Sequence, residues 1–173
     1  MAGLLCGGSG PLAAVEPAEL KPGLVATYQE PAGSRKEEPP RSVVRLESTV
    51  AVLLDRGETV HPRLEALGSA RWLGYVNVVR GGNYRFSATI RHGTVVVQVE
   101  GKEVLRGQAG EQEMTIQGPE VSLGGGVRLL EVAWTCHSTP TRCTLWWEGP
   151  GFIREPLNGH YLGHLPSQRP TQF

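Results

Sequence analysis

Apolar and polar residues alternate most regularly between residues 70 and 105, where three strand-like runs follow one another. In the middle run, residues 84 to 90, every second side chain is apolar and those between are polar or small. A period of two is typical of a strand with one buried face. Breaks that contain glycine separate the runs and tolerate a positive φ, at 81–83, 92–93 and 100–102. The pattern therefore predicts an antiparallel meander.

Shorter runs of the same kind predict strands on both sides of this meander. They lie at 24–28, 43–54, 114–116, 121–123, 127–134 and 143–148. Glu47-Ser48 is expected to divide the second of these runs, and Gly118-Pro119 is expected to end the third. Polar, proline-rich segments predict loops at 29–42, 55–69 and 135–142.

The composition agrees with an all-β fold, because Gly (23) and Pro (13) make up about a fifth of the 173 residues. Seventeen basic and seventeen acidic residues leave no net charge, so a nucleic-acid partner is not expected. The longest apolar run, residues 50 to 54, is far shorter than the ~20 residues of a membrane span. One monomeric domain without a cofactor is expected.

Three segments divide the chain. Residues 1–22 begin with small and apolar residues up to Ala14 and predict a leader or the remnant of a signal peptide, in which Cys6 lies. Residues 23–152 hold the strand-like runs and form the expected domain. Residues 153–173 have apolar anchors without a period, so we expect a C-terminal tail that packs on the domain and leads to a linker.

Five motifs occur in a recognisable order: GLVATY, WLGYVNVVRGGNYRFS, GTVVVQVEGKEVL, VSLGGGVRLLEV and LWWEGPGF. In this order they resemble the protective-antigen fourteen-kilodalton domain, a module of bacterial toxins, glycosidases and adhesins. The ending GPGFIREPL resembles the form joined to c-type cytochrome or other modules of extracytoplasmic bacterial proteins. The resemblance implies an all-β, antiparallel sandwich or barrel, and a periplasmic or secreted location.

The resemblance also implies a ligand site. Lectin-like members hold a calcium ion with two adjacent aspartates before a glycine, and here these positions are Arg91, His92 and Gly93. A later aspartate of the family corresponds to Glu100. Guanidinium and imidazole groups do not replace hard oxygen ligands, so any sugar is expected to bind without calcium, and no metal is expected.

Four tryptophans lie in or next to the predicted strands. Alternation assigns Trp72, Trp134 and Trp147 to the core and directs Trp146 outward. An outward indole stacks on a sugar ring or covers a partner surface, and shielding by the C-terminal tail is an equal alternative. We include Trp146 among the candidate ligand-binding residues.

Cys136 and Cys143 flank a loop between two strands that we expect to be antiparallel neighbours. A disulfide between them is the favoured interpretation, and free thiols are the alternative. Haem attachment requires C-x-x-C-H, whereas only Cys136-His137 is present, and zinc requires about four ligands. His160 and His164 lie in a Gly- and Pro-rich tail, which favours a surface position over a metal site.

Two functions follow from these features. The first is a non-catalytic binding module of an exported bacterial protein that recognises carbohydrate or another cell-envelope component. The alternative is a structural or interaction domain that positions a neighbouring module, for example a cytochrome. An enzyme is not expected, because the hydroxyl groups lie in strands and loops without a nucleophile elbow.

Overall fold

The computed structural model describes residues 14–34, 36 and 38–169. Nearly all regular structure in these residues is antiparallel β, as predicted. Two single-turn 3-10 helices flank the strands, η1 (Pro17–Glu19) and η2 (Pro166–Gln168). The strands are β1 (Lys21–Pro22), β2 (Leu24–Gln29), β3 (Ser42–Glu47), β4 (Ala51–Leu54), β5 (Ser69–Val78), β6 (Gly82–Arg91), β7 (Gly93–Val99), β8 (Lys102–Ala109), β9 (Met114–Leu123), β10 (Gly126–Cys136), β11 (Thr141–Gly149), β12 (Phe152–Pro156) and β13 (Leu162–His164).

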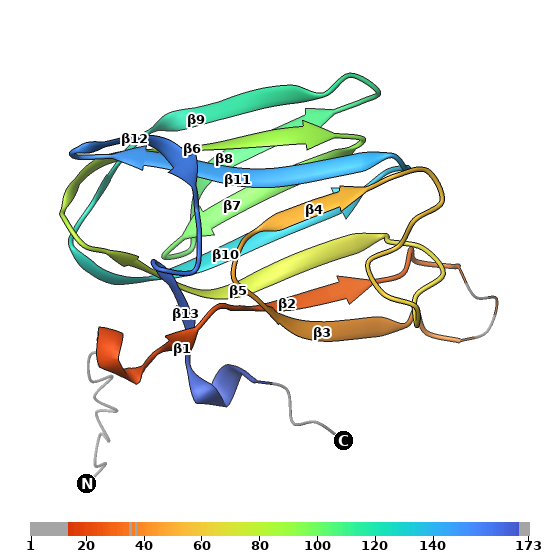
Figure 1. The fold of residues 1–173 in the computed structure, drawn as a ribbon, viewed down its shortest axis with the longest axis horizontal. Coiled ribbons are helices and arrows are strands. Elements are labelled where there is room, and N and C mark those ends of the chain that lie inside the picture. The colour runs from red at the N-terminus through yellow and green to blue at the C-terminus, as the bar shows by residue number, and fades with distance from the viewer. Residues whose placement is uncertain (1–13, 35, 37, 170–173) are drawn as a thin grey trace, which may run out of the picture.

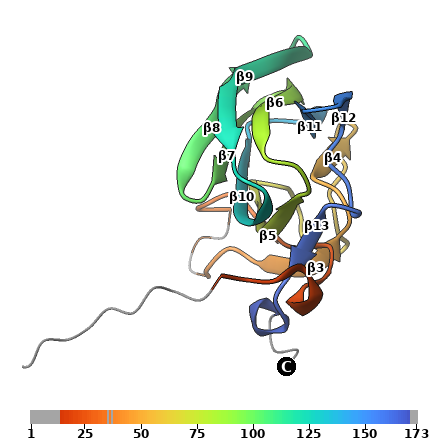
Figure 2. The same ribbon diagram turned by 90° about the vertical axis from the view of Figure 1, so that its left-hand side faces the viewer.

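The strands of the described part form two sheets that pack face to face (Figures 1 and 2). The larger sheet has eight strands, in the order β1-β13-β5-β10-β7-β8, with β2 paired to β5 and β3 to β2. The smaller sheet has five strands, in the order β12-β11-β6-β9, with β4 paired to β11. The architecture is a β-sandwich, which confirms the predicted fold class.

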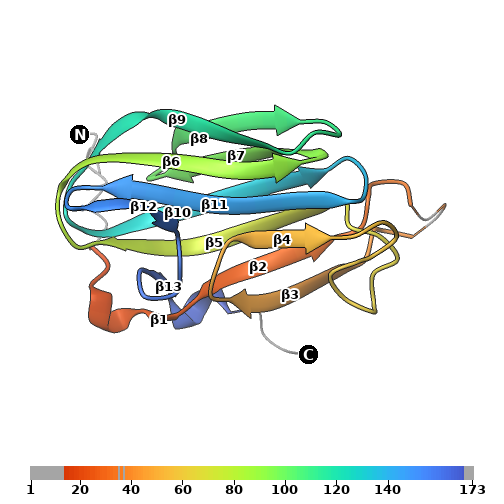
Figure 3. The same ribbon diagram turned by 45° about the horizontal axis from the view of Figure 1, so that its top comes forward.

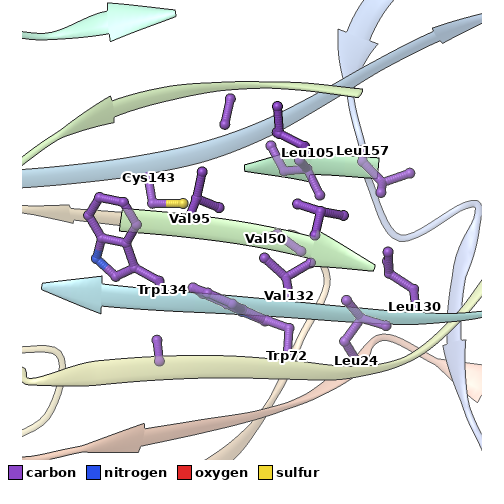
Figure 4. Packing of buried hydrophobic residues seen from close by; sticks show 14 of the residues in the cluster. Leu24, Val50, Trp72, Val95, Leu105, Leu130, Val132, Trp134, Cys143 and Leu157 are labelled. Atoms are coloured by element: carbon purple, nitrogen blue, oxygen red, sulfur yellow. The ribbon is translucent and has the colours of Figure 1, made fainter. Parts of the chain in front are cut away.

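The core lies between the two sheets, where the alternating apolar side chains meet (Figure 4). Tyr84, Phe86, Ala88 and Ile90 of β6 are all buried, so the face assigned from the sequence is confirmed. Trp72 and Trp134 enter from the larger sheet and Trp147 from the smaller sheet, each at most 1% exposed. These three tryptophans occupy the core as predicted.

Several predicted strand boundaries are confirmed, but the predicted antiparallel meander is wrong. β5 and β7 belong to the larger sheet and β6 to the smaller one, so within β5 to β8 only β7 and β8 pair as consecutive strands. The loop predicted at 135–142 shortens to 137–140, and one predicted strand end is wrong. The described residues between 30 and 41 and residues 55–68 form connections without strands, and β3 and β4 separate at residues 48–50. Gly118-Pro119 does not end a strand, because β9 continues from Met114 to Leu123. β9 is an edge strand with an irregular register opposite Arg85, and a proline in such a position breaks no shared ladder.

The two ends of the described chain meet at one edge of the larger sheet (Figure 1). Lys21 pairs with His164 across β1 and β13, and β13 pairs with β5. Leu157 and Leu162 of the C-terminal tail are buried in the core, and β12 extends the smaller sheet.

His164 differs from the prediction for the tail histidines. His160 is exposed, but His164 is fully buried, so its predicted surface position is wrong. Its Nδ1 lies 2.9 Å from the Gly23 carbonyl oxygen, which can only accept a hydrogen bond, and Arg169 Nε donates to its Nε2 at 3.2 Å. A neutral ring thus links the first strands to the tail. The described residues contain no helix long and apolar enough to cross a membrane.

Candidate ligand-binding site

The candidate residues Arg91, His92 and Gly93 form the tight turn between β6 and β7. The turn lies at the end of the sandwich that also carries the β8–β9 loop (110–113) and the β10–β11 loop (137–140), on the right of Figure 1; we call it the loop end. His92 adopts a left-handed conformation with φ 50°, which closes the turn. Gly93 has no side chain because the ring of Trp134 occupies the position of its Cβ.

His92 fastens this turn to both neighbouring loops. Its backbone N–H donates to Gly110 O at 2.9 Å, and its carbonyl accepts from the N–H of His137 at 2.9 Å. Its Nδ1 lies 2.7 Å from Pro140 O, and a carbonyl only accepts, so Nδ1 carries the proton. The turn is therefore held in a defined position by hydrogen bonds to both loops.

Arg91 lies on the outer face of the smaller sheet, directly opposite Arg142 of β11. Arg142 Nη1 pairs with Glu113 at 3.0 Å, on the far side of β6, so this ion pair spans the strand that carries Arg91. Within the described residues Arg91 has no acidic partner, and its buried Nε has no hydrogen-bond partner. Two guanidinium groups face one carboxylate, which leaves this surface with free donors and an excess of positive charge.

These residues do not suit a metal ion. Among residues 14–34, 36 and 38–169, no three His, Cys, Asp or Glu side chains lie close enough together to hold one. A site built from guanidinium and imidazole groups instead offers donors to hydroxyl, carboxylate or phosphate oxygens of a ligand.

Glu100 lies at the opposite end of the sandwich, in the β7–β8 hairpin. The seven residues of β7 separate it from His92, a length of about 23 Å. Its Oε1 accepts from Leu129 N–H at 2.8 Å, and its own N–H donates to Leu129 O at 2.9 Å. Glu100 therefore fixes the hairpin to β10, and the structure does not bring it together with Arg91 and His92.

Trp146 lies on the outer face of the smaller sheet, four residues or about 13 Å along β11 from Arg142. The indole is half-buried, and its Nε1 donates to Thr89 Oγ1 at 3.1 Å. The guanidinium of Arg154 in β12 lies 5.3 Å from the ring centroid, within cation–π range. The outward direction agrees with the alternation of β11, and a residue of the C-terminal tail covers part of the ring.

The predicted disulfide between Cys136 and Cys143 is not formed, and both thiols are free. The prediction assumed that β10 and β11 are neighbours, whereas β10 belongs to the larger sheet and β11 to the smaller one. Cys143 points into the core beside Val95 (Figure 4), and Cys136 Sγ lies 3.6 Å from Ser138 O. Burial raises the pKa of both thiols, that of Cys143 to about 12. Cys6 lies outside the described residues.

Glu30 organises the loop end and was not singled out from the sequence. It is only 3% exposed, and its two carboxylate oxygens accept from the N–H groups of Arg41 and Glu65 at 3.1 and 3.0 Å. The long loops 31–41 and 55–68 are thereby tied together. Beside them lies a hollow of about 340 Å³ lined by Glu30, Pro31, Gly68 and Cys136, among others. The charged and proline-rich composition of residues 29–42 indicates only a solvated loop. No local pattern in the sequence therefore identifies Glu30 as the residue that joins the two loops.

No protein-family model and no curated protein matches the sequence. Solved structures match the fold. An anti-sigma factor domain-containing protein aligns with TM-score 0.68 and 19% identity over 91% of this chain and 51% of that one, so the chain spans about half its length. The PA14 domain of the MpAFP antifreeze protein aligns with TM-score 0.66 and 13% identity, over 92% of this chain and 100% of that domain. The PA14 sugar-binding domain from an RTX adhesin aligns with TM-score 0.60 and 14% identity, over 82% of this chain and 98% of that domain.

These likenesses, together with the two packed sheets, define an antiparallel β-sandwich domain. More particularly, the sandwich has the PA14 fold. At identities below one fifth the likeness shows the fold, and function is argued from the residues of this chain.

Proposed function

We propose that this chain is a non-catalytic recognition module for carbohydrate or another cell-envelope component, within an exported bacterial protein. Its fold is shared with a domain described as sugar-binding, from an RTX adhesin. Loops gathered at one end of a sandwich are a common position for binding residues, because a rigid scaffold holds them. Export is supported by the likeness to adhesin domains, since the free thiols remove the disulfide as a second argument.

The observation that carries the proposal is Arg91. Its guanidinium has no acidic partner among the described residues and lies beside a turn that His92 holds to two loops. A planar group with five donors matches pairs of sugar hydroxyls and carboxylates. Since the turn is already fixed, binding requires little ordering of the protein. Recognition at this end therefore needs no metal ion.

The arrangement around His92 supports a binding role rather than catalysis. Nδ1 is hydrogen-bonded to the Pro140 carbonyl, which fixes the ring to the loop, and among the described residues no hydroxyl or thiol group is hydrogen-bonded to Nε2 as a nucleophile would be. Thr141 Oγ1 donates to the Arg91 carbonyl at 2.9 Å, so that hydroxyl also has a structural partner.

A glycan array tests the proposal. The wild-type chain should bind a defined set of glycans, and Arg91→Ala should lose most of that signal. Arg106→Ala is the matched control, because Arg106 is an exposed arginine paired with Glu103 on β8 at 2.7 Å. Melting temperatures of both variants establish that they are folded. Binding that is unchanged in Arg91→Ala contradicts a role for this residue.

A structural role is the second candidate, and one observation favours it. The described chain enters at β1 and leaves after β13, and these strands pair at adjacent positions. A domain whose ends lie close together can be placed within or beside another module with little disturbance. Silence of the folded wild-type chain across the array, together with stable binding to a neighbouring module such as a cytochrome, would favour this alternative.

A further inference from the structure

A second hollow, of about 340 Å³, lies away from the loop end, beside the β11–β12 turn. Its lining residues lie next to this turn, which is near the left end of Figure 3. Residues from four strands line it, and these strands, β12, β11, β6 and β9, are neighbours in the smaller sheet, although only β11 and β12 are consecutive in the sequence. The side chains that matter are Asn83, Arg85, Glu120, Glu148, Phe152 and Ile153.

One side of this hollow carries planar polar groups. Arg85 on β6 lies between Glu148 on β11 and Glu120 on β9, with nitrogen–oxygen distances of 3.4 and 3.8 Å. Optimal charge-assisted bonds are about 2.7–2.9 Å long, and Arg106–Glu103 reaches 2.7 Å on this protein. The groups around Arg85 are thus held near one another with donor and acceptor capacity left over.

The other side is apolar. Phe152 packs against the core rings of Trp147 and Tyr84, with centroid separations of 5.1 and 6.1 Å, so its position is fixed. Ile153 follows it on β12 and is 87% exposed. A large aliphatic side chain at the rim of a hollow, next to an anchored aromatic ring, offers apolar surface that the domain itself does not bury.

We propose that this hollow binds one neutral pyranose ring. The C–H face of the sugar packs on Phe152 and Ile153, and its hydroxyls exchange hydrogen bonds with Arg85, Glu120 and Glu148. The volume is near the lower limit for ligand pockets, which suits a single ring. Two carboxylates to one guanidinium disfavour an acidic sugar, in contrast to the cationic surface around Arg91.

This inference rests on the proposed function for its ligand class and assigns a separate position to the ligand. Trp146 lies on the same face of β11, two residues from Glu148, and extends the surface toward the middle of the sheet. An oligosaccharide that follows β11 would therefore meet Trp146 and Arg154 next.

Nuclear magnetic resonance titration tests the assignment, with methyl β-glucopyranoside and methyl β-galactopyranoside as probes at up to roughly 50 mM, since affinities of single sugars lie in the millimolar range where contacts are few. At least one probe should shift the backbone amides of Arg85, Gly149 and Ile153 while leaving Arg91 to Gly93 unchanged. Glucuronic acid at the same concentration should shift them less.

Ile153→Ser and Glu120→Ala should each weaken this binding by about tenfold, the effect of one lost contact of ~1.4 kcal/mol. Both residues are largely exposed, so the variants should fold. Glu103→Ala, which removes an exposed carboxylate from another ion pair, is the matched control.

Three results overturn the assignment. Equal binding by the two variants and the wild type removes the hollow as the site. Shifts confined to residues 91–93 and 137–141 overturn the hollow and leave the proposed function standing. No shift with any probe also overturns it, and the glycan array then judges the proposed function by itself.

Discussion

Gly93→Ala probes the contact on which the β6–β7 turn depends. The added methyl group would occupy space held by ring atoms Cζ2 and Cη2 of Trp134, and it would also approach the Thr135 carbonyl oxygen. Trp134 is 1% exposed and lies in the closely packed core, so its ring cannot turn away into free space (Figure 4).

The expected cost follows from overpacking. Forcing one extra methyl group into a filled core typically costs 1–3 kcal/mol, since side chains leave their preferred rotamers or the backbone shifts. The backbone at this turn cannot easily shift to make room, because His92 is hydrogen-bonded to Gly110, His137 and Pro140. We expect the free energy of unfolding to fall by ~2–3 kcal/mol.

Urea unfolding followed by tryptophan fluorescence and circular dichroism measures this change. Gly110→Ala is the matched control at the same end, because nothing lies within 4 Å of its Cβ position. That variant should be neutral or slightly more stable. A loss below ~0.5 kcal/mol for Gly93→Ala, with unchanged tryptophan emission, would refute the packing described for Trp134.

Two further predictions concern the core. Phe86→Ala should lower the free energy of unfolding by ~3–5 kcal/mol in the same assay, because the ring is fully buried, whereas Val79→Ala, at a residue 76% exposed, should change it little. Burial raises the pKa of Cys143 to about 12, so the folded chain keeps a proton that the unfolded chain loses above pH ~9. Stability should therefore fall as the pH rises from about 9 to 12, by ~1 kcal/mol per pH unit, and thermal melts of Cys143→Ala should lack this part of the slope.

The part of the fold that local alternation controls was predictable from the sequence. Residues 84 to 90 show a clean period of two, and the buried face of β6 is the one that the apolar residues indicate. Glycine-containing breaks likewise located the turns around Gly93 and Gly101. At Gly101 the glycine itself has a positive φ, whereas in the other turn His92 has the positive φ and Gly93 makes room for Trp134.

Sheet membership was not predictable in this way. A strand shows the same alternation of apolar and polar residues whether the next strand pairs with it or belongs to the facing sheet. The link from β10 to β11 makes that crossing, which places Cys136 and Cys143 in different sheets and prevents their bridge. The strand end predicted at Gly118-Pro119 was wrong for a related reason. A proline is tolerated within β9 because this strand lies at an edge of its sheet, and the sequence does not show that position.

The candidate sites show the same division. Family resemblance brought Arg91, His92 and Gly93 together because they are consecutive. It also suggested Glu100, although a strand of seven residues carries that side chain to the other end. The hollow around Arg85 could not be predicted from the sequence. Its lining comes from four strands, and the alternation of residues does not show the order of strands in a sheet.

The most direct measurement of the central claim is a glycan array probed twice with the folded chain, once in calcium-containing buffer and once in excess chelator. The side chains of Arg91 and His92 carry no oxygen atoms that could coordinate calcium. We therefore expect the same glycans to bind with the same intensity in both buffers. Binding that disappears in chelator would contradict recognition without a metal ion, and the absence of binding in both buffers would contradict carbohydrate recognition itself.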